Sequence, residues 1–127
     1  MLNRSNRFLP LSGTSIKKFI TDTTGTVDQR DQFSAALVDS ALNGYTLVID
    51  TPVKIDATNG REVYIPDGAR IFFTGSGRIN GYWLTNPLFV ALHSNFEIVN
   101  LDILYQGPGI DASVDYGSSP GNAGGVS

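Results

Sequence analysis

Three short apolar segments, Leu47-Val-Ile49, Ile71-Phe-Phe73 and Phe96-Glu-Ile98, recur along this chain with their first residues 24 and 25 positions apart. A repeat of this length, built from β-branched and aromatic residues, is typical of a solenoid in which each coil stacks on the one before it. Turn-forming pairs such as Asn59-Gly60 and Asn80-Gly81 separate these segments from further strand-like pieces. Residues 45–105 are therefore predicted to form parallel β coils.

One amphipathic helix is predicted ahead of the strands, over residues 28–43. Its buried face is expected to carry five small or apolar side chains at helical spacing: Phe33, Ala36, Leu37, Ser40 and Ala41. Asp28 is the expected N-cap, and Asn43-Gly44 is a pair that commonly ends a helix with a left-handed residue. Together these features predict a mainly β fold, with an N-terminal capping helix followed by the first coils of a right-handed parallel β-helix.

The composition of the chain excludes several classes of function. Its 127 residues are 41% hydrophobic and 17% charged, as expected for one folded unit. The net charge of −3 gives no general reason to bind nucleic acid, and the absence of cysteine excludes thiolate catalysis and cysteine-ligated zinc. No segment has the roughly 20 apolar residues of a membrane span or the apolar run of a signal peptide. We expect no membrane insertion, no metal and no cofactor, and synthesis in a cytoplasm.

Charge and composition divide the chain into three parts. Residues 1–20 form a basic arm with a charge of +4, and residues 16–20 at its end have the pattern of a short strand. The basic residues of the arm are Arg4, Arg7, Lys17 and Lys18. All the remaining residues together carry a charge of −7. Among them, residues 21–105 hold the helix and the β coils, whereas residues 106–127, with six glycines, are a lateral loop or a truncated continuation.

Three motifs in the first half of the chain carry a resemblance to a known family. They are Gln32-Phe-Ser-Ala-Ala-Leu37, Gly44-Tyr-Thr-Leu-Val-Ile49 and Val63-Tyr-Ile-Pro-Asp-Gly68. Their succession resembles the opening of the pectate-lyase-type β-helix superfamily, in which a helix rich in small residues covers the open end of the core. Within it, the short basic arm resembles that of bacteriophage tailspikes, the trimeric receptor-binding depolymerases. The resemblance covers roughly residues 16–105. The glycine-rich turn usual at the start of the family is replaced by Lys18-Phe-Ile-Thr-Asp-Thr-Thr-Gly-Thr26.

The resemblance implies the N-terminal part of a tailspike, a homotrimer in the virion tail. Residues 1–20 are then expected to attach the spike to an acidic phage tail or baseplate protein. The coils begin a β-helix that recognises, and in the full-length protein degrades, the capsule or lipopolysaccharide of the host. Two alternatives remain. One is a bacterial polysaccharide lyase, hydrolase or epimerase of the same fold, and the other is a virion adhesin without enzymatic activity.

Few residues are candidates for chemistry on a glycan. Glu97 and Asp102 are expected at outward-facing positions and form a weak candidate for the carboxylate pair that glycan cleavage requires. With twelve acidic residues in the chain, such a pair also arises by chance, so we expect this chain alone to be inactive. Tyr82 and Trp83 are weak candidates for stacking on sugar rings, with packing in the core as the alternative. His93 is the sole histidine and is expected in a turn.

Overall fold

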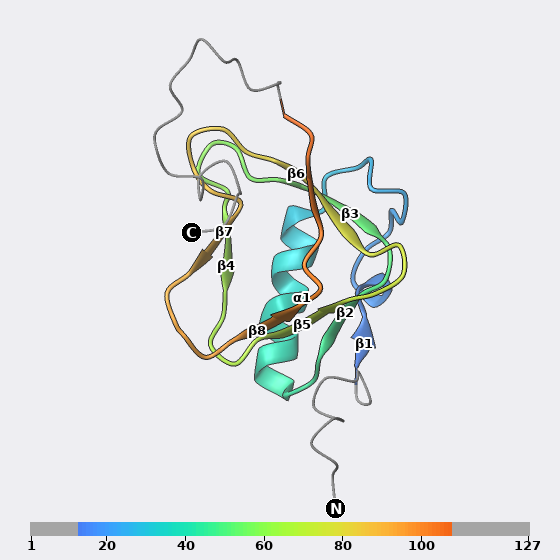
Figure 1. Cartoon of the computed structure of the whole chain (residues 1–127), viewed down its shortest axis with the longest axis vertical. Helices are drawn as coiled ribbons and strands as arrows, with labels where there is room; N and C mark the ends of the chain where they lie inside the picture. Colours follow the sequence, from blue (N-terminus) through green and yellow to red (C-terminus); the bar gives the residue numbers. More distant parts are fainter. Residues whose placement is uncertain (1–12, 108–127) are drawn as a thin grey trace, which may run out of the picture.

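The computed structural model describes residues 13–107, and within this range the protein is mainly β with one α-helix (Figure 1). The elements are β1 (Thr14–Ser15), the 3₁₀ helix η2 (Ile16–Lys18), α1 (Arg30–Asn43), β2 (Leu47–Ile49), β3 (Pro52–Asp56), β4 (Val63–Ile65), β5 (Arg70–Phe73), β6 (Arg78–Tyr82), β7 (Phe89–Ala91), β8 (Glu97–Val99) and β9 (Ile103–Tyr105). Every pairing between these strands is parallel. The prediction of a mainly β fold with parallel strands and one helix is confirmed.

The strands form three small sheets that the chain visits in a fixed order. The first sheet has the order β1-β2-β5-β8, the second β3-β6-β9 and the third β4-β7. Each pass along the chain therefore contributes one strand to each sheet in turn, and the last described pass contributes β8 and β9. Leu47 pairs with Ile71 and Arg70 with Glu97, so the register step between passes runs from 24 to 27 residues. The predicted interval of 24 residues from Leu47 to Ile71 is confirmed, whereas Ile71 pairs with Ile98 rather than with Phe96, so the second interval is two residues longer than predicted.

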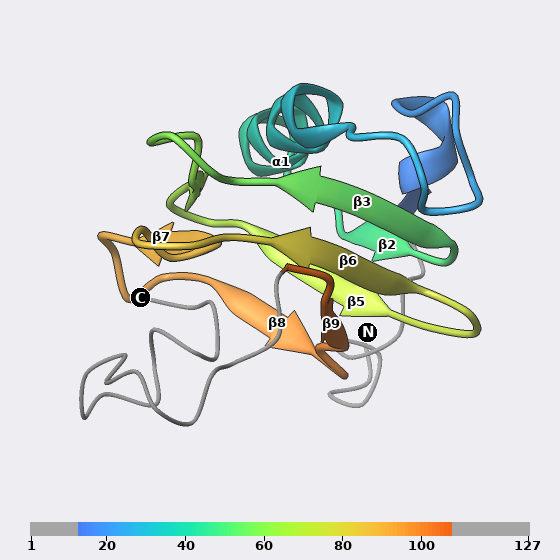
Figure 2. The same ribbon diagram turned by 90° about the horizontal axis from the view of Figure 1, so that it is seen from above.

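The helix lies at one end of the stacked strands. In Figure 2, α1 covers the side where β2 and β3 lie, and β8 and β9 lie on the opposite side. The helix contacts β2, β3 and β4, the three strands of the first full pass. Its inner face buries Phe33, Ala36, Leu37 and Ser40, because one face of the helix must cover the interior between the sheets. Ala41, the fifth residue predicted on this face, is only half-buried.

The C-terminal end of α1 was predicted correctly, whereas its N-terminal end was not. Gly44 ends the helix with a φ of 69°, and this left-handed stop was expected. The helix begins at Arg30 with Gln29 as N-cap, so the prediction of Asp28 as N-cap was wrong. The Asp28 carboxylate instead accepts hydrogen bonds from the backbone N–H groups of Arg30 (3.2 Å) and Asp56 (2.8 Å). Asp28 thereby joins the start of the helix to the end of β3.

Residues before the helix cover the free edges of the first pass. β1 pairs with β2, and Asp28 forms an isolated parallel bridge with Lys54 of β3. The short strand predicted at residues 16–20 is wrong, because Ile16–Lys18 form a 3₁₀ helix. Ile16 and Ile20 are buried, so the second half of the predicted arm belongs to the folded body. These contacts shield backbone groups that would otherwise form an open sheet edge.

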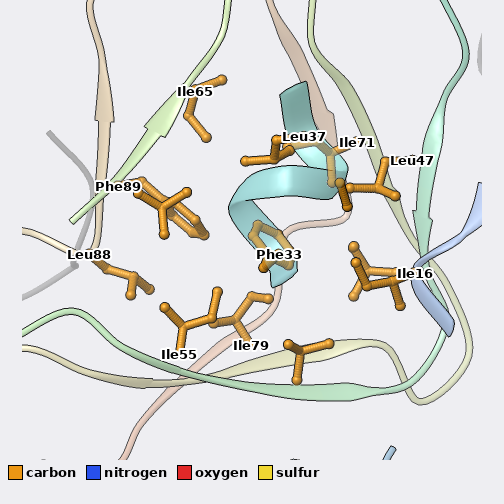
Figure 3. Packing of buried hydrophobic residues seen from close by; sticks show 14 of the residues in the cluster. Ile16, Phe33, Leu37, Leu47, Ile55, Ile65, Ile71, Ile79, Leu88 and Phe89 are labelled. Carbon is orange, nitrogen blue, oxygen red and sulfur yellow. The ribbon is translucent and has the colours of Figure 1, made fainter. Parts of the chain in front are cut away.

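The core between the sheets gathers around Phe33 (Figure 3). Its ring lies 6.1 Å from that of Phe89 in the third sheet, measured between centroids. Leu37 is also fully buried and shares the same cluster with the three residues predicted to contact it, which are Leu47, Ile49 and Ile65. The helix and all three sheets therefore contribute to one continuous core.

The segment from Phe96 to Leu104 departs from its prediction as one bent strand. It is divided at Asn100, whose φ of 58° turns the backbone, and β8 and β9 join different sheets. Ile98 and Ile103 pack against the core as predicted, but Leu101 is 42% exposed rather than inward. The bend at Asn100 was expected, whereas the change of sheet was not.

We expect Phe33→Ala to lower the free energy of unfolding by about 3–5 kcal/mol, because it removes a fully buried ring and leaves a cavity beneath the helix. Leu84→Ala is the control, since Leu84 is 56% exposed and its truncation should cost within about 0.5 kcal/mol. Urea denaturation measures both values. Equal losses in the two variants would show that Phe33 does not close the core.

Candidate functional site

The hollow nearest to the predicted carboxylates lies where the β5–β6 turn meets the bend between β8 and β9. It has a volume of about 280 Å³ and is lined by Phe73, Thr74, Gly75, Gly77, Asn100 and Asp102. The turn approaches the neighbouring pass so closely that a Cβ atom on Gly77 would lie 1.7 Å from the carbonyl oxygen of Ile49. Only glycine fits this position, which fixes one wall of the hollow.

The structure does not bring the two predicted carboxylates into this hollow together. Asp102 lines it, whereas Glu97 lies in β8 of the first sheet and is not part of the lining. Asp102 is also the only charged side chain in the lining. Glycan cleavage requires a second carboxylate at a defined separation, and none lines this hollow.

Each of these carboxylates has an arginine partner from the preceding pass. Glu97 lies 3.5 Å from Arg70, its direct register partner on β5, measured between Oε1 and Nη1. The Asp102 Oδ2 atom lies 3.5 Å from the Arg78 Nε atom. Opposite charges at neighbouring positions of adjacent strands stabilise the register of a sheet modestly. The two acids therefore act as cross-strand partners in the described structure.

The two aromatic candidates differ in their surroundings. Trp83 is 4% exposed, and its ring packs against Tyr105 with centroids 4.5 Å apart. The Tyr105 hydroxyl also donates a hydrogen bond to the Trp83 carbonyl oxygen at 3.1 Å. Trp83 thus lacks an open ring face for a sugar, because it is buried under the third pass. Tyr82, at the end of β6, is half-buried and pairs in register with Asp56.

The predicted attachment residues lie partly outside the described range. Arg4 and Arg7 lie outside the described residues, which begin at residue 13. Residues 108–127, most of the predicted lateral loop or truncated continuation, also lie outside the described residues. Lys17 and Lys18 lie in η2 and are exposed. Lys17 Nζ is 3.9 Å from the Asp50 carboxylate, a surface pair of little energetic weight. Both ammonium groups are therefore accessible to a partner near β1.

A polar network that the sequence analysis missed holds the loop between η2 and α1. The buried Gln29 side chain accepts a hydrogen bond from the Thr21 N–H (2.7 Å) and donates one to the Asp22 carbonyl (2.7 Å). The Asp22 carboxylate accepts from the hydroxyl and N–H of Thr24 and from the N–H groups of Thr26 and Val27. The Asp-Thr-Thr-Gly-Thr sequence is the available signal, because Asp and Thr side chains commonly bond to nearby backbone in turns.

Further hydrogen bonds attach this loop to the strand stack. The Thr51 hydroxyl donates to the Thr23 carbonyl (2.8 Å), and the Asn80 amide donates to the Gly25 carbonyl (3.1 Å). Asn80 is buried, so this bond satisfies a donor that would otherwise be costly to bury. These two bonds therefore fix the loop over the strand stack.

Between residues 13 and 107, no three His, Cys, Asp or Glu side chains come close enough together to hold a metal ion. No helix in that range is long and apolar enough to cross a membrane.

Comparisons with protein-family models, with curated proteins and with solved structures give no match to this chain.

The loop predicts a pH dependence of stability. The Thr24 hydroxyl, with backbone N–H groups, holds the pKa of Asp22 well below its ordinary value of 3.8. Because the folded pKa is depressed, the stabilising contribution is present above the unfolded value and is lost as the pH falls below it. We expect Asp22→Asn to flatten the loss of unfolding free energy between about pH 5 and pH 2.

Asp67→Asn is the matched control, because Asp67 is exposed in the turn after β4. It should keep the wild-type slope in urea denaturation measured across that pH range. Parallel curves for Asp22→Asn and the wild type would contradict the assigned role of Asp22.

Proposed function

We propose that this chain is the N-terminal part of a bacteriophage tailspike, and that its stacked strands are the first coils of a right-handed parallel β-helix. The observation that carries this proposal is the fixed order in which the chain visits three parallel sheets, with a step of 24 to 27 residues. A chain that repeats the same three-strand pass at similar spacing is growing along one axis, as solenoids do. The motifs around Phe33 and Val63 add the family resemblance.

The unequal ends of the stack support a longer β-helix beyond it. The first pass is covered by β1, by the Asp28 bridge and by α1. After β7, within residues 13–107, the exposed side chains include large apolar ones: Leu92, Phe96, Leu101 and Leu104. Apolar groups exposed at the end away from the helix are what a stack needs if further coils continue on it. Those coils would form the surface that recognises, and as a depolymerase cleaves, host polysaccharide.

Charge supports a separate role for the covered end. The basic arm has a charge of +4 against −7 for the remainder of the chain, and its described lysines are exposed in η2. An acidic surface on a phage tail or baseplate protein would attract this end and orient docking. Attachment at the covered end leaves the growing end of the β-helix directed toward the host.

An apolar ladder on the outside of the first sheet supports a homotrimer. Val48, Phe72 and Val99 are register partners on β2, β5 and β8 and lie on the face turned away from the core. Outward strand positions of a solvated sheet are usually polar, so a continuous apolar row favours contact with another surface. Parallel packing of three copies around one axis would cover this row in each subunit.

We expect the 127-residue chain alone to release no sugar from host capsule or lipopolysaccharide, because no second carboxylate lines the hollow at Asp102. Reducing-end assays and the absorbance of unsaturated uronates measure hydrolysis and elimination respectively. Cleavage by the wild-type chain that disappears in Glu97→Gln or Asp102→Asn would contradict this expectation.

Deletion of residues 1–12 from the full spike should lower its copy number on purified virions by about tenfold, the factor that corresponds to 1.4 kcal/mol of lost docking energy. The deletion stops before β1 because Ile16 and Ile20 belong to the core. Lys54→Gln, which removes a positive charge from β3 instead, is the control and should assemble normally. Unchanged copy number in the deletion would show that the arm is not the anchor.

A further inference from the structure

Three asparagine residues of this chain are followed directly by glycine: Asn43, Asn59 and Asn80. In such a pair, the backbone nitrogen of the second residue can attack the Cγ atom of the asparagine side-chain amide. Glycine obstructs this attack least, because it has no Cβ atom and its backbone reaches the required geometry most freely. The three pairs are alike in sequence, but their surroundings in the structure differ.

The first pair, at the end of α1, is held by hydrogen bonds on both residues. The Asn43 side-chain amide donates to the Asp39 carbonyl oxygen at 2.9 Å and to the Asp39 carboxylate at 3.1 Å. The Gly44 N–H donates to the Ser40 carbonyl oxygen and so closes the last turn of the helix. Attack at Asn43 would therefore require these bonds to break first.

The third pair lies inside β6 and is held on both sides. The buried Asn80 amide donates to the Gly25 carbonyl oxygen at 3.1 Å. Gly81 pairs with Ile55 on β3 and with Tyr105 on β9. A central strand exposes such a position only when the neighbouring strands separate, which costs far more free energy than the opening of a surface turn.

The second pair, Asn59-Gly60, lies in the turn between β3 and β4 and lacks these restraints. Both residues are exposed, with φ angles of 59° and 75°. Within residues 13–107, the Asn59 side chain has no hydrogen-bond partner, and the Gly60 N–H belongs to no helix or strand pairing. A Cβ atom built on Gly60 would meet no other atom within 4 Å. The attacking nitrogen and the amide are thus unobstructed, and only local motion of the turn is needed to join them.

We propose that Asn59 is a site of spontaneous deamidation in the folded protein. The Gly60 nitrogen bonds to the Asn59 Cγ atom, the side-chain amide nitrogen leaves as ammonia with the proton from Gly60, and a cyclic imide remains. Water then opens the imide at either carbonyl carbon, which gives aspartate or isoaspartate. The net reaction consumes water and releases ammonia, so it requires no oxidant, cofactor or enzyme. The site is independent of the proposed function.

The reaction acts on contacts that join this turn to α1. Arg61 follows the turn directly, and its guanidinium lies 3.3 Å from the Asp28 carboxylate and 3.5 Å from that of Asp31. The Arg30 side chain also donates to the Arg61 carbonyl oxygen at 2.8 Å. Both products place a new carboxylate close to Arg61 in the chain, and isoaspartate also lengthens the main chain there. Ageing of the protein therefore introduces a competitor for Arg61 beside the start of the helix that covers the strand stack.

Incubation of the full chain in mildly alkaline buffer measures all three rates in one sample, with trypsin digestion and fragment-ion mass spectrometry as the readout. We expect Asn59 to convert about tenfold faster than Asn43 and Asn80, which corresponds to about 1.4 kcal/mol of added barrier at the two protected pairs. In guanidinium chloride the three rates should converge, because unfolding removes the protection. Equal rates in the folded chain would overturn the proposal. No conversion at Asn59 in the time that the unfolded chain converts would also overturn it.

Asn59→Gln provides a second test by ion-exchange chromatography. Deamidation adds a negative charge, so the wild-type chain should accumulate an acidic species that Asn59→Gln lacks, because glutamine must close a larger ring. Asn43→Gln makes the same change at a protected pair, is the matched control and should keep the acidic species. Circular dichroism checks that both variants are folded. The same acidic species formed at the wild-type rate in Asn59→Gln would contradict the assignment.

Discussion

Phe33 fills the opening of the apolar interior at the first pass, and each later pass stacks on the core that it closes. Its ring reaches Phe89 in the third sheet, while α1 contacts β2, β3 and β4 together. Parallel strands cannot begin a stack without such a cover, because the first strands would expose both their inner side chains and a free backbone edge. β1 and the Asp28 bridge cover those edges on the first and second sheets. The covering elements thus all precede the strands that they protect.

Polar contacts hold this cover in place where apolar packing alone would not. Arg30 donates to the carbonyl oxygens of Arg61 and Glu62, both at 2.8 Å, which ties the start of α1 to the segment before β4. Gln29 holds the preceding loop together through part-buried hydrogen bonds, and the Asn80 amide joins that loop to the second sheet. The end covered by α1 is therefore rich in specific bonds, whereas β9 and the bend before it, at the opposite end, leave Leu104 and Leu101 exposed. This difference underlies the proposal that the stack continues as a β-helix.

The sequence was sufficient to predict features with a local signal. The spacing of Leu47 and Ile71 predicted the parallel stacking, and Asn43-Gly44 predicted the helix end, because a repeat interval and a left-handed glycine leave direct traces in the chain. Contacts between passes left no such trace. The N-cap was misassigned because the bond between Asp28 and the N–H of Asp56, 28 residues further on, cannot be read from the sequence. Glu97 was taken as a catalytic candidate because its pairing with Arg70 depends on the strand register, which the sequence does not reveal. Burial of Trp83 likewise depends on Tyr105, which arrives one pass later.

An electron cryomicroscopy structure of the intact spike on its virion would test the central proposal most directly. The account predicts that the full-length spike adds further parallel strands on β7, β8 and β9 in a right-handed sense. It also predicts three copies around one axis, with the arm end at the tail. The account would be contradicted by antiparallel pairing on β8 or β9, or by a second cover that closes the β8–β9 end without further passes. A single copy on the axis would also contradict it.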